Sequence, residues 1–298
     1  MKRPIVNSDN KIGDRAAPSP PPGEPLFLHR GLAWLEFNRR VLSLALDGRT
    51  PLLERVRFLS IFSSNLDEFF QKRVGGLKRQ VAAGVVPRRR DDFSPARLLA
   101  MVRQTVLPLL AQQARCFEEE IRPALAANGI DLLAWDGLAA VEREAAARYF
   151  KANGYPVLTP LAVDPGHPFP FISNLSTSLG VILRHPAHGQ ELFARVKVPS
   201  MLPAWIRLET SAHPDRHRFV SLTDLISHNL ADLFPGMQIV DTMPFRVTRN
   251  ADIERDEEDA DDLLELIEEE VQQRRMAGAV RLEHGREPNP RMLEFLCE

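Results

Sequence analysis

The stretch RVRFLSIFSSNLDEFFQKR, residues 55–73, decides how the first part of the chain folds. Its apolar side chains recur every three or four positions, in a stripe made of Leu59, Phe62, Leu66, Phe69 and Leu77. This spacing predicts an amphipathic helix with one buried face. Thr50-Pro51 is a good helix start, because a capping side chain precedes a proline whose missing N–H does no harm. We expect the helix to run to about residue 80, with Gly75-Gly76 as a weak point.

Similar helical patterns flank this stretch. Apolar residues keep helical spacing over 32–46 and 95–127, and Asp47-Gly48 and Asn128-Gly129 end these runs. Residues 26–133 are therefore predicted to be a helical N-terminal domain, a small bundle of three or four helices. Residues 1–25 hold six prolines among Ser, Asn and Asp. That composition predicts a disordered Pro-rich tail.

After residue 135 the pattern changes. One helix is predicted over 138–151, and helical runs over 221–234 and 256–276 follow later. Between them lie short β-rich runs separated by Pro and Gly: 157–163, 177–183, 192–198, 237–247 and 280–283. Residues 134–298 are therefore predicted to be a mixed α+β head domain, and the fold class of the chain is α + α/β.

The composition narrows the class of protein. Of 298 residues, 44% are hydrophobic and 26% are charged, which is typical of a globular chain and excludes a fibrous one. Two cysteines, Cys116 and Cys297, exclude a disulfide scaffold and favour a cytoplasmic location. No apolar run approaches the roughly 18 residues of a membrane span, so none is expected. The formal net charge of −2 hides an asymmetry, because residues 39–103 hold 14 basic and 6 acidic residues, whereas 251–270 hold 12 acidic residues and one Arg.

Three polar residues of the first stretch share one helix face beside the apolar stripe: Asn65, Glu68 and Lys72. An amide there could hydrogen-bond a base or a ribose, and Lys72 or Arg73 could meet a phosphate. The alternative is a solvated face of i, i+3 and i+4 pairs, and the residue pattern alone favours it.

Other candidates also leave two interpretations open. Lys78-Arg79 and Arg88-Arg89-Arg90 flank a loop that either attracts a polyanion or is simply solvated, and without interleaved aromatic residues no nucleic-acid partner is expected. Asp164 and His167 lie in a proline-rich loop, where they form an acid–base pair or only hold the turn. The scattered histidines suggest no metal site.

Several of these segments, in this order, resemble polyphosphate kinase of the bacterial, histidine-phosphorylated type. WLEFNRRVL (34–42), RFLSI (57–61) and NLDEFF (65–70) are similar to its N-terminal domain. The likeness continues through 158–176, and then through LFPGM (233–237) and PFRVTRNAD (244–252). It extends from about residue 26 to about residue 282.

The resemblance implies a helical N-terminal domain, a head domain implicated in dimerisation, and two C-terminal domains similar to phospholipase D, which we expect to be absent here. The implied reaction transfers the γ-phosphoryl of ATP to a histidine and then to polyphosphate. None of the eight histidines matches that nucleophile, and the Mg²⁺ ligands are expected in the C-terminal half. No catalytic or metal residue is therefore expected in this chain, whereas the resemblance makes Asn65 a residue that contacts ATP.

We therefore expect a fragment or truncated product of a polyphosphate kinase, inactive alone, with ATP, ADP and inorganic polyphosphate as partners. A homo-oligomer formed through the head domain is also expected. The alternative is a non-catalytic binding or dimerisation module. One departure concerns the first helix, since His29-Arg30-Gly31 stands where Asn-Arg-Glu is more usual, which predicts a poorly capped start.

Overall fold

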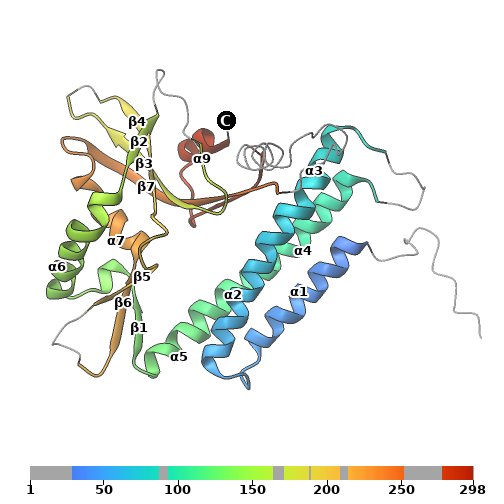
Figure 1. The fold of residues 1–298 in the computed structure, drawn as a ribbon, viewed down its shortest axis with the longest axis horizontal. Helices are drawn as coiled ribbons and strands as arrows, with labels where there is room; N and C mark the ends of the chain where they lie inside the picture. Colours follow the sequence, from blue (N-terminus) through green and yellow to red (C-terminus); the bar gives the residue numbers. More distant parts are fainter. Residues whose placement is uncertain are drawn as a thin grey trace, which may run out of the picture.

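The computed structural model of the chain describes residues 29–86, 93–163, 171–187, 189–208, 214–251 and 277–297. Long helices occupy one side of the molecule and the two sheets occupy the other (Figure 1). The predicted tail (1–25) and the predicted acidic helix (256–276) lie outside the described residues.

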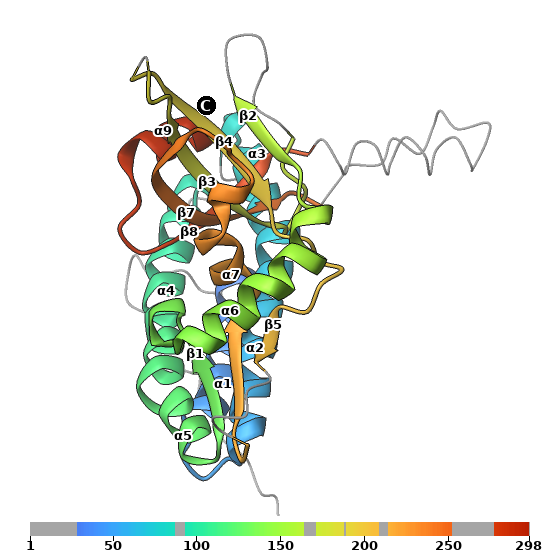
Figure 2. The ribbon, with the colours of Figure 1, turned by 90° about the vertical axis from the view of Figure 1, so that its left-hand side faces the viewer.

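The helical part contains two π-helical turns that connect helices without breaking their path. Its elements are α1 (Arg30–Leu46), α2 (Leu52–Phe69), η1 (Phe70–Val74), α3 (Gly75–Ala82), α4 (Pro95–Arg115), η2 (Cys116–Ile121) and α5 (Arg122–Ala127). Figures 1 and 2 show α1, α2 and α4 lying side by side. The predicted helix over 52–80 is thus continuous, but its irregularity is a π turn directly before Gly75 rather than a bend at the glycines.

The core of the bundle confirms the predicted stripe on α2. Leu59, Phe62, Leu66 and Phe69 are all buried, and they pack with buried residues of α1 and α4. The last residue of the predicted stripe, Leu77 on α3, is only partly buried. The chain leaves the bundle at Gly129, whose φ of 80° is typical of a glycine that ends a helix.

The predictions for the capping of α1 and α2 at their N-termini were both wrong. Thr50 does not cap α2, because Pro51 itself occupies the N-cap position and no side-chain cap hydrogen bond forms. The start of α1 is capped after all, since His29 Nδ1 accepts a hydrogen bond from the Gly31 N–H at 3.1 Å.

The head contains two sheets. The strands are β1 (Ile130–Leu133), β2 (Pro160–Val163), β3 (Thr177–Arg184), β4 (Glu191–Lys197), β5 (Trp205–Leu208), β6 (His217–Ser221), β7 (Gln238–Arg249) and β8 (Ala279–His284). Five of them form an antiparallel sheet in the order β2-β4-β3-β7-β8. The other three form a smaller sheet in the order β1-β6-β5, in which β1 and β6 are parallel.

Helices cover the sheets. The head helices and helical turns are η3 (Trp135–Gly137), α6 (Ala140–Tyr149), η4 (Phe150–Gly154), η5 (Tyr155–Val157), α7 (Leu222–His228), η6 (Leu230–Asp232) and α9 (Pro290–Cys297). Residues of β3 and β4 alternate between two cores: Val181 and Ala194 pack in the core that includes α6 and α7, whereas Ile182 and Phe193 pack with Met292 of α9. The strands β3 and β4 of the five-stranded sheet are therefore buried on both faces.

All five predicted β-rich runs are confirmed as strands, with small shifts in their ends; they are β2, β3, β4, β7 and β8. The sequence did not predict β1, β5, β6 or α9. The strand β1 matters most, because it ends the helical segment and yet pairs with a strand of the head, in the register Ile130 to His217. The two parts of the chain therefore share a sheet.

Candidate functional site

Asn65 lies on α2 on the side that faces α1, and its side chain is half-buried. The apolar stripe packs α2 against α1, so the polar residue beside the stripe comes to lie at the seam between the two helices. The position suits a contact that is both held by the protein and open to a ligand.

The partner of Asn65 is a second asparagine across that seam. Asn65 Nδ2 donates a hydrogen bond to Asn38 Oδ1 at 2.9 Å. Asn38 is fully buried on α1, and its Nδ2 donates in turn to the backbone carbonyl oxygen of Phe62 at 3.1 Å. The two amides therefore form a short chain of hydrogen bonds that ends on the backbone of α2.

Glu68 and Lys72 are not engaged with Asn65. They pair with each other at 2.7 Å, and both side chains are exposed. Arg73 lies close enough to His29 that its charge, second to burial of the imidazole, lowers the pKa of His29. The predicted polar face exists, but the ion pair on it has the solvated character of the alternative interpretation.

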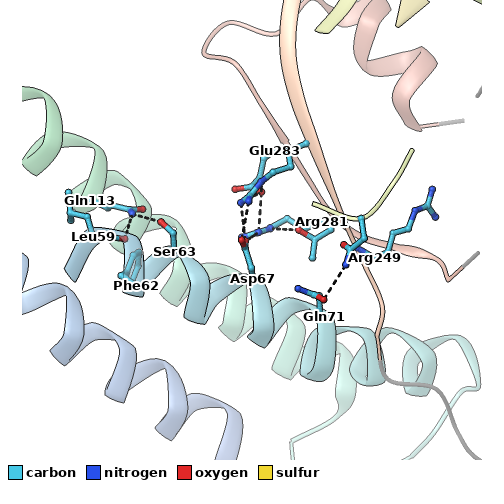
Figure 3. A network of polar contacts seen from close by, with 12 residues as sticks. Leu59, Phe62, Ser63, Asp67, Gln71, Gln113, Arg249, Arg281 and Glu283 are labelled. Carbon is cyan, nitrogen blue, oxygen red and sulfur yellow. Dashed lines mark hydrogen bonds and ion pairs between the residues drawn. The ribbon is translucent and has the colours of Figure 1, made fainter. Parts of the chain in front are cut away.

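Asp67 has a different role, because it points away from α1 toward the strands of the head (Figure 3). Its two carboxylate oxygens accept hydrogen bonds from Arg246 on β7 at 2.9 and 3.0 Å, and from Arg281 on β8. Glu283 binds both arginines, at 2.7 and 3.0 Å. This cluster of two carboxylates and two guanidiniums, hereafter the Asp67 cluster, fastens α2 to the five-stranded sheet.

The π turn after Asp67 provides a second attachment. The backbone carbonyl of Gln71 accepts a hydrogen bond from the Ala251 N–H at 3.0 Å, just past the end of β7. Its side-chain oxygen accepts from Asn174 Nδ2 at 3.1 Å, and Asn174 Oδ1 accepts from the Arg249 N–H at 2.8 Å. A π turn frees a carbonyl from the regular helix pattern, and here that carbonyl binds the head.

Gly75 lies at the close approach between these parts. A β-carbon at this position would overlap the Oδ1 and Cγ atoms of Asn250. Asn250 follows β7, so the missing side chain of Gly75 lets the end of that strand lie against the helix.

A further ion cluster joins the opposite end of the bundle to the head. Asp131 of β1 pairs with Arg216 and Arg218, at 2.5 and 3.6 Å. Arg218 also pairs with Glu142 of α6 at 2.6 Å, and the Glu142 side chain is fully buried. The helical part and the head are thus held at two separated places.

Several candidates from the sequence fall outside the described residues: Arg88-Arg89-Arg90, Asp164 and His167. Within the described ranges, no group of three or more His, Cys, Asp or Glu residues is arranged to hold a metal ion. No helix in the part of the chain that the structure describes is long and apolar enough to cross a membrane.

Family models match nearly the whole chain. The polyphosphate kinase N-terminal domain matches residues 27–133, and the polyphosphate kinase middle domain matches residues 141–298. The chain belongs to the polyphosphate kinase family. The resemblance on which Asn65 was selected is therefore a true family relationship.

Comparisons with individual proteins lead to the same family. The chain is 48% identical to the polyphosphate kinase of Thermosynechococcus vestitus over 275 residues, covering 91% of this chain and 38% of that protein. It is 47% identical to the polyphosphate kinase of Streptomyces coelicolor, covering 91% of this chain and 35% of that protein. The crystal structure of polyphosphate kinase from Porphyromonas gingivalis matches with a TM-score of 0.73 at 26% identity, over 91% of this chain and 37% of that one.

The chain thus spans a little over a third of the length of these polyphosphate kinases. The parts of the family that the chain matches are the N-terminal and middle domains, in agreement with the expected helical domain and α+β head domain. Neither Asn38 nor Asp67 was selected from the sequence, although both lie in the segments WLEFNRRVL and NLDEFF that carry the family resemblance.

Proposed function

We propose that these two domains belong to a cytoplasmic enzyme that reversibly transfers the γ-phosphoryl of ATP to inorganic polyphosphate through a phosphohistidine. In this proposal Asn65 contacts ATP, and the transfer itself requires the histidine-bearing half and the Mg²⁺ ligands found elsewhere in the family. The observation that carries the ATP contact is the half-buried amide of Asn65, held by Asn38 at the seam between α1 and α2.

The nucleotide contact is tested by replacing Asn65 with alanine in a catalytically active protein that includes these domains. Loss of one neutral hydrogen bond predicts a rise in the KM for ATP of about 3- to 10-fold. Ser64→Ala, an exposed neighbour on the same helix, is the matched control and should leave KM unchanged. Wild-type KM and kcat in Asn65→Ala would contradict the contact.

The basic segment supports a second part of the proposal, which is that residues 39–103 attract polyanions. Their net charge is +8, from 14 basic and 6 acidic residues. Replacing Arg88, Arg89 and Arg90 together with alanine should weaken polyphosphate binding at low salt and have little effect at high salt. Unchanged affinity at low salt would exclude this role.

The activity of this chain alone is tested directly. Incubated with ATP, Mg²⁺ and polyphosphate, it should yield neither ADP nor phosphorylated protein, whereas turnover would show that the two domains suffice.

Light scattering tests the proposed homo-oligomer, and a monomer at micromolar concentration would argue against association through the head domain. A non-catalytic dimerisation module would also form oligomers without turning over ATP. The two interpretations are separated by adding the chain to an active polyphosphate kinase, because a module that pairs with intact subunits should form mixed oligomers.

A further inference from the structure

The two asparagines at the α1–α2 seam determine each other's orientation. Asn38 is completely buried, and its side chain lies 3.1 Å from the backbone carbonyl oxygen of Phe62. A carbonyl oxygen only accepts hydrogen bonds, so the amino group of Asn38 must face Phe62. The Asn38 Oδ1 atom must then point to the other side.

On that other side lies Asn65, 2.9 Å away. Because Asn38 presents an oxygen there, Asn65 must present its amino group in return, and its own Oδ1 faces away from Asn38. Among the residues that the structure describes, none donates a hydrogen bond to Asn65 Oδ1. The Asn65 side chain is half-buried, so this acceptor remains open to a ligand.

We propose that Asn38 is a positioning residue that locks the amide of Asn65 so that Asn65 presents its carbonyl oxygen to the nucleotide. The inference rests on the proposed contact between Asn65 and ATP and gives that contact a chemical direction. An acceptor needs a donor, and phosphate oxygens supply none at neutral pH. The nucleotide group that Asn65 Oδ1 binds is therefore an N–H or O–H, either the 6-amino group of adenine or a ribose hydroxyl.

The lock has an energetic basis. Rotating the Asn65 amide by 180° would place two oxygens against each other at the seam and leave a buried acceptor without a donor, which is costly. An isolated surface asparagine has no such preference and would present either end. Removing the Asn38 side chain should therefore weaken the nucleotide contact without touching the nucleotide.

The test compares Asn38→Ala, Asn65→Ala and the double variant in an active protein that includes these domains, with KM and kcat measured separately for ATP. Each single variant should raise the KM for ATP about 3- to 10-fold at nearly constant kcat. The double variant should be no worse than Asn65→Ala alone, because Asn38 acts only through Asn65. Where Asn38→Ala fails to fold, Asn38→Ser, which keeps a small polar side chain, replaces it.

Three analogues identify the donor on the nucleotide. Inosine triphosphate carries an oxygen in place of the 6-amino group, and 2′-deoxy-ATP and 3′-deoxy-ATP each lack one of the two ribose hydroxyls. The analogue that lacks the bound donor should show a raised KM with wild type and no further rise with either variant. Full sensitivity of all three analogues to both variants would overturn the assignment of Asn65 as an acceptor for these groups.

The control is Cys116→Ala, which removes a buried side chain from the same bundle core but contacts Arg55 rather than Asn65. It should lower stability and leave the KM for ATP unchanged. A raised KM in Asn65→Ala with a wild-type KM in Asn38→Ala would overturn the positioning role while preserving the ATP contact. Additive effects in the double variant would also overturn it, and wild-type values in every variant would remove the ATP contact itself.

Discussion

Asp67 and Arg246 form a two-pronged ion pair, with guanidinium nitrogens 2.9 and 3.0 Å from the two carboxylate oxygens, across 179 positions of the chain. Asp67 lies two residues after Asn65 on the same helix. One short segment of α2 therefore carries the proposed nucleotide contact on one side and the attachment to the head on the other.

Removing the carboxylate of Asp67 should destabilise the protein strongly. Arg281, which is only 9% exposed, would lose one of its two carboxylate partners and keep only Glu283. Loss of a hydrogen bond to a charged group in such a place costs about 2 kcal/mol. Urea unfolding of Asp67→Ala measures the loss. The matched control is its neighbour Glu68→Gln, which breaks only the exposed pair with Lys72 and should leave the unfolding midpoint unchanged. Equal midpoints for the two variants would contradict a structural role for the Asp67 cluster.

Gly75→Ala should destabilise the protein even though alanine favours a helix by about 1 kcal/mol over glycine. The new methyl group would collide with the Asn250 side chain, and overpacking of this kind costs about 1 to 3 kcal/mol. In an Asn250→Ala background the collision largely disappears, so the same change should become neutral or stabilising. Denaturant unfolding of wild type, Gly75→Ala, Asn250→Ala and the double variant measures the four free energies of unfolding. If the effects of the two single changes simply add in the double variant, the close approach between Gly75 and Asn250 is refuted.

The cap on α1 should make stability depend on pH. Burial and the charge of Arg73 lower the pKa of His29 below its usual value, so the unfolded chain binds a proton that the folded chain does not. The contribution of His29 is therefore complete above about pH 6.5 and is lost as the pH falls through the lower folded-state pKa. His29→Asn offers a cap oxygen that does not titrate. The difference in unfolding free energy between wild type and this variant should change between pH 7 and pH 5, and a constant difference would argue against the cap.

The two cysteines should differ in reactivity. Burial raises the pKa of the Cys116 thiol, which also lies against Arg55 and the carbonyl of Ala45, whereas Cys297 is exposed on α9. A thiol reagent should therefore label one cysteine rapidly in the native protein and the second only on unfolding. Rapid labelling of Cys297→Ser under native conditions would be inconsistent with a closed bundle core around Cys116.

The sequence predicted the elements whose apolar pattern is long and local. The stripe on α2 is buried as expected, and the long strands β3, β4 and β7 lie close to the predicted runs. The strand β1 was missed because it has only four residues and its stability comes from pairing with β6, which lies far along the chain.

In the candidate site, too, the residues whose partners are distant in the sequence were not predicted. Family resemblance selected Asn65, but Asn38 was not selected, because its partner is a backbone carbonyl that no residue pattern reveals. Asp67 was not selected, because its arginine partners follow 179 and 214 positions later and no local pattern points to them. Gly75 appeared to be a point of flexibility, whereas its importance lies in the space that a side chain would fill.

The parallel pairing of β1 with β6 also bears on the order in which the protein folds. Each pair in this register joins residues that are far apart in the sequence, such as Ile130 with His217, and such contacts form late because a long loop must first close. The bundle, built from contacts between neighbouring helices, should form earlier. A recombinant head domain that begins after Leu133 would keep β6 but lose its partner strand, and the exposed edge would favour pairing between molecules and aggregation.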